Sequence, residues 1–448
     1  MKWEKETVRK RRMQSKDNRV KIGFLGLVSM VIGAQLGASA FLMPAQMARF
    51  RTLGLGGWFL GCLGAILITL VFSFLCIKTT RVGGPHVYAR MFFGEKVGFF
   101  VTWVYWCGAW ACNPIVISIA VNYLMSITGI LSPIEKLMLE ITIIVLLTLL
   151  NTRGIKVTSN VEIVLTIIKI MPLIIVPIVA LTRMNFENFT ELTPENASVA
   201  DTLIKATILS FWGFVGLEEG TSPASVVNNP RKTIPLAIVL GTACVAMICI
   251  LNTVAAFGVI HPAQLENEAA PFAKILLILF GGTYNNLIGI TTFLICIGSL
   301  NAWVFFSGQI AQSAAKEGMF PGIFAKLNRH GAPGCALWIG AIGTGVILFL
   351  QKSPLCADKI NAFLDMSIVV YIALYTTTIL AHMKFMYQTK VKSVLQIFVS
   401  TLALIFCGFV LYNSDWFNFL ALGIMLVSGI PIYFFRHRKG ANGKQWSF

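Results

Sequence analysis

Long apolar runs follow one another along the whole chain, and they limit its fold more than any other feature. Twelve such runs lie at about 24–47, 58–77, 97–125, 134–150, 161–181, 203–226, 234–260, 287–314, 336–350, 363–382, 394–411 and 417–435. About 20 apolar residues in a helix cross the hydrocarbon core of a bilayer. Only 12% of the 448 residues are charged, against about 25% in soluble proteins. The sequence therefore predicts an all-α integral membrane protein with twelve transmembrane helices.

Basic residues predict which side of the membrane each loop faces. Of the 36 Lys and Arg residues, 27 fall in the N-terminal tail, in every second loop or in the C-terminal tail. Cytoplasmic loops carry such an excess of Lys and Arg. We therefore expect both termini in the cytoplasm, and a multi-pass protein of the plasma membrane, or of the inner membrane if the chain is bacterial. The net charge of +17 then requires no nucleic-acid partner, because the excess of basic residues in the cytoplasmic segments accounts for it. The expected partner of the apolar spans is the lipid bilayer.

Two of the runs are interrupted near their middle by glycine and proline. Gly33–Pro44 breaks the first run, and Ser210–Pro223 breaks the sixth, where the break itself is expected over Gly213–Gly216. Glycine weakens a helix, and proline removes a hydrogen-bond donor. Broken segments at matching places in two halves of a chain point to the substrate site of a transporter.

The two breaks divide the chain into a predicted five-plus-five inverted repeat. The segments are a basic cytoplasmic tail at 1–21, a first repeat at 22–182, a second repeat at 203–382, two extra helices at 392–435 and a cytoplasmic tail at 436–448. Each repeat has an odd number of spans, so the second must be inverted relative to the first. Helices 1 and 6 are expected to be the broken ones.

Free backbone groups at the breaks predict a site for a zwitterion. The half-helix that starts near Ser39 offers N–H groups and a positive dipole end to a carboxylate, and the carbonyls before a break suit an ammonium group. Glu218 lies beside the second break, and a carboxylate at membrane depth is a functional hypothesis by default. Glycine-rich packing seams are the alternative explanation of both breaks. If helical geometry holds there, Glu219, one position on, points about 100° away from Glu218, and the two are not expected to face the same cavity.

Other classes of site are absent from the sequence. It contains no HExxH run, no nucleotide-binding loop, no Ser/His/Asp set and no His/Cys spacing typical of a metal site. We therefore expect no enzyme activity, no cofactor and no metal. A channel is the remaining alternative, but no repeated ring of pore-lining residues is visible.

Four stretches together resemble the amino acid–polyamine–organocation superfamily. They are GAQLGASAFLMP (33–44), GGPHVYARMFFGEKVGFF (83–100), LSFWGFVGLEEGTSPASVVNNPRKTIPLAI (209–238) and GSLNAWVFFSGQIAQSAAKEGMFPGIFAKLN (298–328). Within that superfamily the chain is similar to the basic amino acid/polyamine antiporters, which exchange arginine for agmatine, ornithine for putrescine or lysine for cadaverine. The resemblance covers nearly all of residues 22–435.

The resemblance implies the five-plus-five fold, alternating access and a set of site residues. Carried over by position, the substrate-binding residues would be Gly37, Ala38 and Ser39 (backbone amides for the carboxylate), Trp212 (gate), Gly216 and Leu217 (unwound stretch), Trp303 (stacking), and Tyr105 and Asn113 (gate and polar contact). Glu218 would be the proton-sensitive carboxylate. The chain departs from the family pattern in having Ser39 for a glycine, His86 for a tyrosine, and the additional Glu219.

Two further charged residues lie within spans and need an explanation. Lys169 in span five requires a partner at membrane depth; related branches of the superfamily carry a lysine in a similar stretch, where it could load and release a proton. If Lys169 couples transport to protons, Lys169→Met should abolish the pH dependence and leave binding intact. A fixed structural counter-ion is the alternative.

Asp365 in span ten is a candidate contact for a cationic substrate, with pairing to Lys169 or helix capping as alternatives. Glu140 and Glu162, nearer span ends, are expected to snorkel or pair.

The leading functional prediction is a secondary transporter that moves amino acids, with cationic amino acids or polyamines as the expected substrates, by alternating-access exchange. The alternative is a proton-coupled amino acid symporter of broader specificity that uses Lys169. Uptake without an internal counter-substrate would distinguish the two. Expected partners are the small-molecule substrate, protons as a candidate coupling ion, the lipid bilayer and a second copy of the chain in a homodimer.

Overall fold

The computed structural model describes residues 23–79, 84–129, 132–221, 227–268, 271–281, 285–352 and 360–436. The predicted N-terminal tail, Pro223 and most of the predicted C-terminal tail lie outside these ranges. The α-helices are α2 Phe24–Gln35, α3 Ala38–Ala48, α4 Leu53–Lys78, α5 Pro85–Ala111, α6 Asn113–Thr128, α7 Pro133–Asn151, α8 Ile155–Ala180, α9 Val199–Ser210, α10 Pro230–Val259, α11 Pro262–Leu265, α12 Pro271–Phe280, α13 Asn285–Lys316, α14 Gly334–Gln351, α15 Ile360–Thr389, α16 Val394–Tyr412 and α17 Asn418–Arg436. Short 3-10 helices lie at Leu181–Arg183, Phe186–Phe189, Phe211–Phe214, Glu219–Thr221 and Gly322–Ala325.

Ten helical segments in the described ranges are long and apolar enough to cross a membrane. A multi-pass membrane protein is therefore confirmed. The expected fourth and twelfth spans are also helices, α7 and α17, but they fall outside this set of ten. The count of twelve spans thus stays a prediction, as does the cytoplasmic position of the termini.

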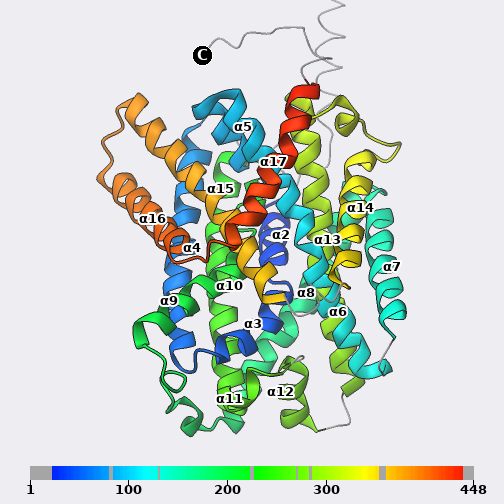
Figure 1. Cartoon of the computed structure of the whole chain (residues 1–448), viewed down its shortest axis with the longest axis vertical. Coiled ribbons are helices and arrows are strands. Elements are labelled where there is room, and N and C mark those ends of the chain that lie inside the picture. Colours follow the sequence, from blue (N-terminus) through cyan, green and yellow to red (C-terminus); the bar gives the residue numbers. More distant parts are fainter. Residues whose placement is uncertain are drawn as a thin grey trace, which may run out of the picture.

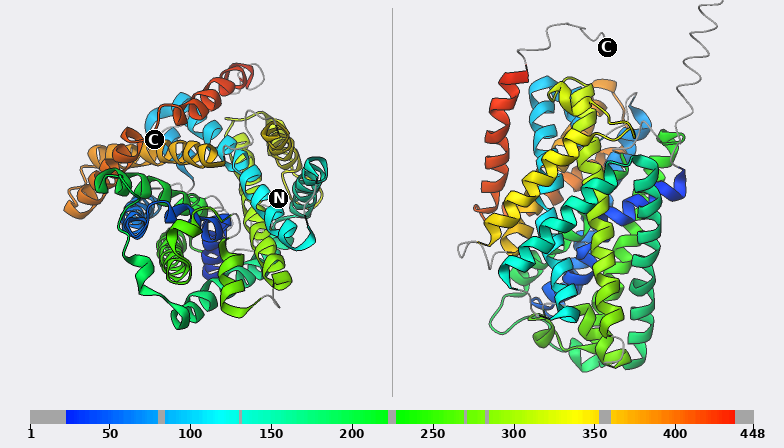
Figure 2. Two further views of the ribbon diagram at one scale, coloured as in Figure 1. Left: turned by 60° about the horizontal axis from the view of Figure 1, so that its bottom comes forward. Right: turned by 90° about the vertical axis from the view of Figure 1, so that its right-hand side faces the viewer.

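The broken first span lies at the centre of a bundle of long helices (Figures 1 and 2). Helix α2 packs against α10, and at the matching place of the predicted second repeat α9 packs against α4. In the same way, α8 packs against α13, and α15 packs against α5. A five-plus-five repeat predicts such matched pairs, although the repeat itself stays a prediction. The last helix, α17, lies at the edge of the bundle in both views of Figure 2.

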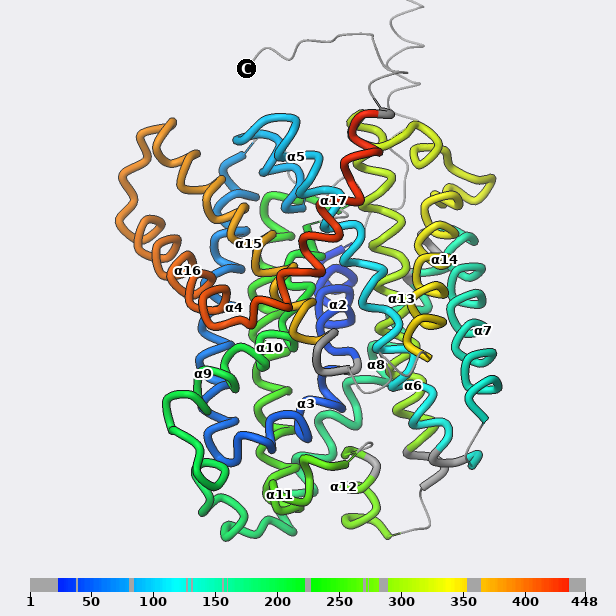
Figure 3. Tube along the Cα trace, in the orientation of Figure 1, coloured from blue at the N-terminus to red at the C-terminus, as the bar shows by residue number. Residues whose placement is uncertain are grey.

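The break in the first span is confirmed. Helix α2 ends at Gln35, and α3 begins at Ala38 after two residues, Leu36 and Gly37, that leave the helical conformation. Figure 3 shows this change of direction where the blue trace passes from α2 to α3. At Gly37 the chain approaches α13 so closely that a methyl group would lie 2.0 Å from Oγ of Ser299. Only glycine permits this approach.

The break in the sixth span is also confirmed, but it begins earlier than expected. We predicted a break over 213–216, whereas α9 already ends at Ser210 and the chain tightens into a 3-10 turn over Phe211–Phe214. Val215 is extended, with ψ 129°, and Gly216 has φ +97°. This φ is unfavourable for a residue with a Cβ atom. The two residues therefore unwind the span. Glu218 and Glu219 follow two and three residues after Gly216.

Candidate functional site

The two broken spans meet at a cavity in the middle of the bundle. Its lining residues are Ala34, Gln35, Gly37, Ser39, Cys112, Asn113, Val116, Trp212, Val215, Ser299 and Trp303. Five of the predicted substrate-binding residues are therefore brought together: Gly37, Ser39, Asn113, Trp212 and Trp303. The space open to the centre of a water molecule is about 40 Å³, which is enough for only a few waters. A ligand larger than a few waters would fit only if the cavity expanded.

The start of α3 forms one wall of the cavity. Its N-cap residue, Gly37, has no side chain that could bond the first N–H groups of the helix, and Ala38 is the first helical residue. The N–H of Gly37 donates to the carbonyl of Gln35 at 2.9 Å, and the Ser39 hydroxyl donates to the same carbonyl at 2.8 Å. Uncapped N–H groups and the positive end of a helix attract anions.

Two amide side chains supply unpartnered acceptors at the same cavity. Gln35 donates through Nε2 to Oγ1 of Thr242 at 3.2 Å and to the carbonyl of Val31 at 3.4 Å. Because the Val31 carbonyl can only accept, the amide nitrogen must face it, and Oε1 then has no hydrogen-bond partner among the described residues. Oδ1 of Asn113 also has no partner among them. Buried acceptors of this kind are costly unless a donor reaches them, and an ammonium group is such a donor.

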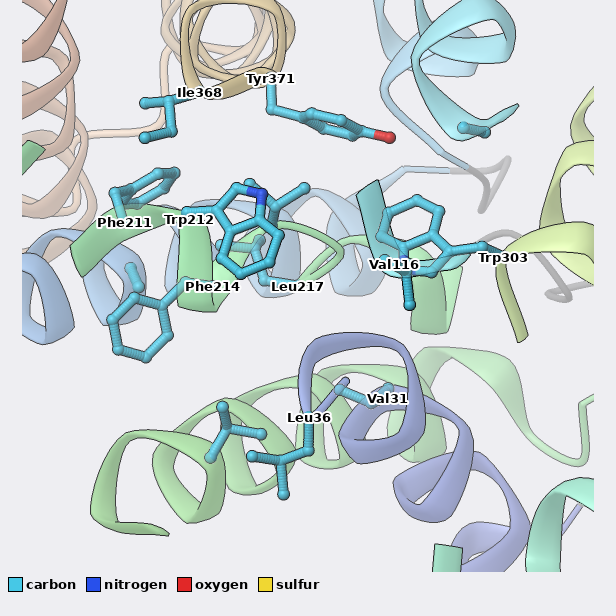
Figure 4. Close-up of a cluster of buried hydrophobic side chains, with 14 of the residues drawn as sticks. Val31, Leu36, Val116, Phe211, Trp212, Phe214, Leu217, Trp303, Ile368 and Tyr371 are labelled. Atoms are coloured by element: carbon cyan, nitrogen blue, oxygen red, sulfur yellow. The ribbon is translucent and has the colours of Figure 1, made fainter. Parts of the chain in front are cut away.

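Aromatic rings bound the cavity from two helices. Trp212 follows α9, and Trp303 lies on α13; both are more than nine-tenths buried. Trp303 makes an edge contact with Tyr371 of α15, with ring centroids 6.0 Å apart. Figure 4 shows Trp212, Val116 and Trp303 in one layer between Tyr371 on one side and Val31 and Leu36 on the other. These rings can cover a ligand and offer π faces to a cation.

Both glutamates of the second break are fully buried and contact tyrosines. The Tyr375 hydroxyl donates to one oxygen of Glu218, and the other oxygen, Oε1, makes no hydrogen bond that meets the distance and angle limits within the described ranges. Tyr105 donates to Oε1 of Glu219 at 2.9 Å. Tyr371 lies within electrostatic range of both carboxylates. The expected angle of about 100° between Glu218 and Glu219 assumed helical geometry, which the chain does not have between Val215 and Glu218. Whether the two carboxylates serve one site stays a prediction.

The remaining predicted residues lie around the cavity rather than on it. Leu217 is fully buried behind it, and the N–H of Gly216 donates to the Tyr375 hydroxyl at 3.4 Å. Asp365 is half-buried on α15, within electrostatic range of Arg49 and Asp415, and it does not line the cavity. Its contact with a substrate stays a prediction.

Lys169 has an acidic partner at the first break. Its ammonium group lies 3.1 Å from Oε1 of Glu162 and 3.2 Å from the carbonyl oxygen of Gly33 on α2. The expectation that Glu162 pairs is thereby confirmed. Glu140 pairs likewise, with Lys352 at 2.8 Å.

Sequence inspection missed two residues of this region, Gln35 and Ser299. It also missed that Glu162 is the partner of Lys169. Gln35 is polar within an apolar run, which was an available signal. Ser299 carried none, because a serine in a span commonly bonds its own helix. The pairing of Glu162 and Lys169 joins residues two turns apart on α8, which is beyond the three- and four-residue spacings at which helical side chains usually meet.

Comparison with known proteins identifies the family of the chain. Residues 22–435 match the amino acid permease family. A putrescine transporter PotE of Haemophilus influenzae is 26% identical over 377 residues, which cover 82% of this chain and 85% of the relative. A cadaverine/lysine antiporter of Escherichia coli K12 is 25% identical over 430 residues, 93% of this chain and 95% of the relative. These relatives are transporters, in agreement with the prediction that the chain is not an enzyme. The protein thus belongs to the amino acid permease family.

Proposed function

We propose that this protein exchanges cationic amino acids or polyamines across the plasma membrane, or across the inner membrane if the chain is bacterial, by alternating access. One observation carries the proposal: the uncapped start of α3 and the unpartnered oxygens of Gln35 and Asn113 belong to residues of one buried cavity. The helix start suits a carboxylate, and the two oxygens suit an ammonium group. An amino acid carries both.

A cationic side chain or a second amine is favoured by two further observations. Trp212 and Trp303 both line the cavity, and aromatic rings attract cations. Two relatives are described as a putrescine transporter and a cadaverine/lysine antiporter. Both lysine and the two diamines present primary ammonium groups.

Glu218 is proposed as the proton-sensitive group of this site. It is fully buried, it contacts Tyr375, and one of its oxygens has no partner in the described part of the chain. A buried carboxylate can exchange a proton when its surroundings change during transport. The carboxylate of Glu218 would then respond to the arrival of a cationic substrate.

Exchange in proteoliposomes tests the proposal. The purified full chain is reconstituted with unlabelled lysine inside, and uptake of labelled arginine, lysine, ornithine, putrescine and cadaverine is measured with and without a pH gradient. Uptake of at least one cationic compound that depends on internal substrate is expected. A panel on which no compound exchanges would refute the proposal.

Proton-coupled symport is the second candidate, because Lys169 is buried beside the first break. A symporter would accumulate substrate into vesicles that contain no counter-substrate when the outside is acidic. An exchanger would show no such accumulation, so the same vesicles without internal lysine separate the two functions.

A further inference from the structure

The last carbonyl of α2 is already fully bonded within the protein. It belongs to Gln35 and accepts two hydrogen bonds, from the N–H of Gly37 at 2.9 Å and from the hydroxyl of Ser39 at 2.8 Å. A carbonyl oxygen has two lone pairs, so both are engaged before any ligand binds. Gln35 and Ser39 line the cavity and are almost inaccessible, with 3% and 4% of their surface exposed.

This carbonyl lies beside the start of α3, because Ser39 in the first turn of that helix bonds it. The first N–H groups of α3 attract a carboxylate. In an α-amino acid the ammonium group and the carboxylate are attached to the same carbon atom. An α-ammonium would therefore need an acceptor at this place while the carboxylate is bound at α3. None of the described lining residues of the cavity carries a carboxylate that could replace this acceptor.

The amide oxygen of Gln35 lies farther from the start of α3 than this carbonyl does. The side chain turns back along α2, because Nε2 donates to the carbonyl of Val31, four residues earlier, and to Oγ1 of Thr242 on α10. One helical turn rises about 5 Å. An ammonium group that lies several carbons from the carboxylate matches this separation. It would find Oε1 of Gln35, or Oδ1 of Asn113, without another hydrogen-bond partner among the described residues.

We propose that Ser39 is a specificity-determining residue of this site. Its hydroxyl takes the acceptor that an α-ammonium would need, so the site binds a carboxylate and a distant ammonium group and does not recognise the α-ammonium. The favoured amino acids are then those whose ammonium group lies several carbons from the carboxylate. This inference rests on the proposed function and narrows its substrate class.

Two compounds that differ only in the α-ammonium test the inference. They are lysine and ε-aminocaproate, which is lysine without its α-amino group. A buried ammonium group without an acceptor is costly. Lysine should therefore bind the wild-type protein no more tightly than ε-aminocaproate does. Dissociation constants are measured with the labelled compounds on the detergent-purified full chain.

Ser39→Ala removes only the hydroxyl group and frees one lone pair of the Gln35 carbonyl. A hydrogen bond from a charged donor is stronger than one between neutral groups, so lysine should bind about tenfold more tightly to Ser39→Ala than to wild type. The affinity for ε-aminocaproate should change by less than about threefold, because this compound has no α-ammonium.

Thr148→Val is the matched control. The Thr148 hydroxyl is also buried and also donates four residues back along its helix, to the carbonyl of Ile144 at 2.7 Å, but Thr148 does not line the cavity. This variant should leave the ratio of the two affinities unchanged. Melting temperatures of all three proteins in detergent show whether each is folded.

Three results would overturn the inference. The first is a wild-type protein that binds lysine more than about threefold more tightly than ε-aminocaproate; this result needs no variant, so it decides even when Ser39→Ala fails to fold. The second is a folded Ser39→Ala protein that binds lysine no more tightly than wild type does. The third is an equal loss of affinity for both compounds in Ser39→Ala, which would show that the hydroxyl binds the carboxylate.

Cadaverine, which is lysine without its carboxylate, separates failure of this inference from failure of the proposed function. If wild type binds none of the three compounds, the proposed function fails and the inference fails with it. If wild type binds at least one of them but lysine and ε-aminocaproate give one of the three contrary results, only the role of Ser39 is refuted.

Discussion

Replacing Gly37 with alanine tests whether the close approach of α3 to α13 forms the cavity. The added methyl group would lie 2.0 Å from Oγ and 2.7 Å from Cβ of Ser299. Rotation of the serine side chain can move Oγ away, but Cβ is fixed to the backbone of α13. The helices must therefore separate. Overpacking of this kind costs about 1–3 kcal/mol, which corresponds to about 5- to 150-fold in affinity.

The structure also specifies which second substitution relieves the clash. Ser299→Gly removes both Oγ and Cβ, so the double variant Gly37→Ala/Ser299→Gly should bind substrate within about threefold of the Ser299→Gly single variant. Ser299→Ala removes only Oγ and keeps Cβ, so Gly37→Ala/Ser299→Ala should remain impaired. Affinity is measured with labelled lysine or putrescine on the detergent-purified full chain, and melting temperatures are measured beside it.

Two outcomes would contradict this reasoning. The first is a Gly37→Ala variant with wild-type affinity, which would mean that the two helices do not approach as closely as described. The second is equal rescue by Ser299→Ala and Ser299→Gly, which would assign the clash to the hydroxyl group alone.

Three further predictions concern the cavity, its carboxylate and the surface. Trp303→Ala should weaken binding of a cationic substrate about 2- to 30-fold, because a cation–π contact is lost. Binding of a neutral amino acid of similar size should weaken less. Equal losses for the two substrates would argue against a cation–π role. Glu218→Gln keeps an acceptor for the Tyr375 hydroxyl but removes the charge, so the pH profile of exchange should flatten. An unchanged pH profile would assign the pH sensitivity to another group. Asp201→Asn breaks an exposed pair with Lys205, so melting should shift by no more than about 2 °C; a larger loss would show that this pair is not solvent-screened.

The interrupted spans illustrate how much the sequence alone could predict at the site. Gly33–Pro44 and Ser210–Pro223 were identified from glycine and proline alone, and both segments are broken helices in the structure. The break was predicted from Gly213, two residues after the α-helix gives way at Phe211. The reason is that the tightening to a 3-10 turn at Phe211 depends on packing against α4 and α15 rather than on local propensity.

The sequence by itself determined that the chain is a multi-pass helical membrane protein with two broken spans, because hydrophobic length and backbone breaks are local properties. It also determined that Lys169 needs a partner. Only the tertiary structure decided which groups meet: Glu162 with Lys169, Glu219 with Tyr105, and Ser299 against Gly37. The last two contacts join residues more than 100 positions apart, and their distances follow from helix packing, which no periodicity along the chain encodes.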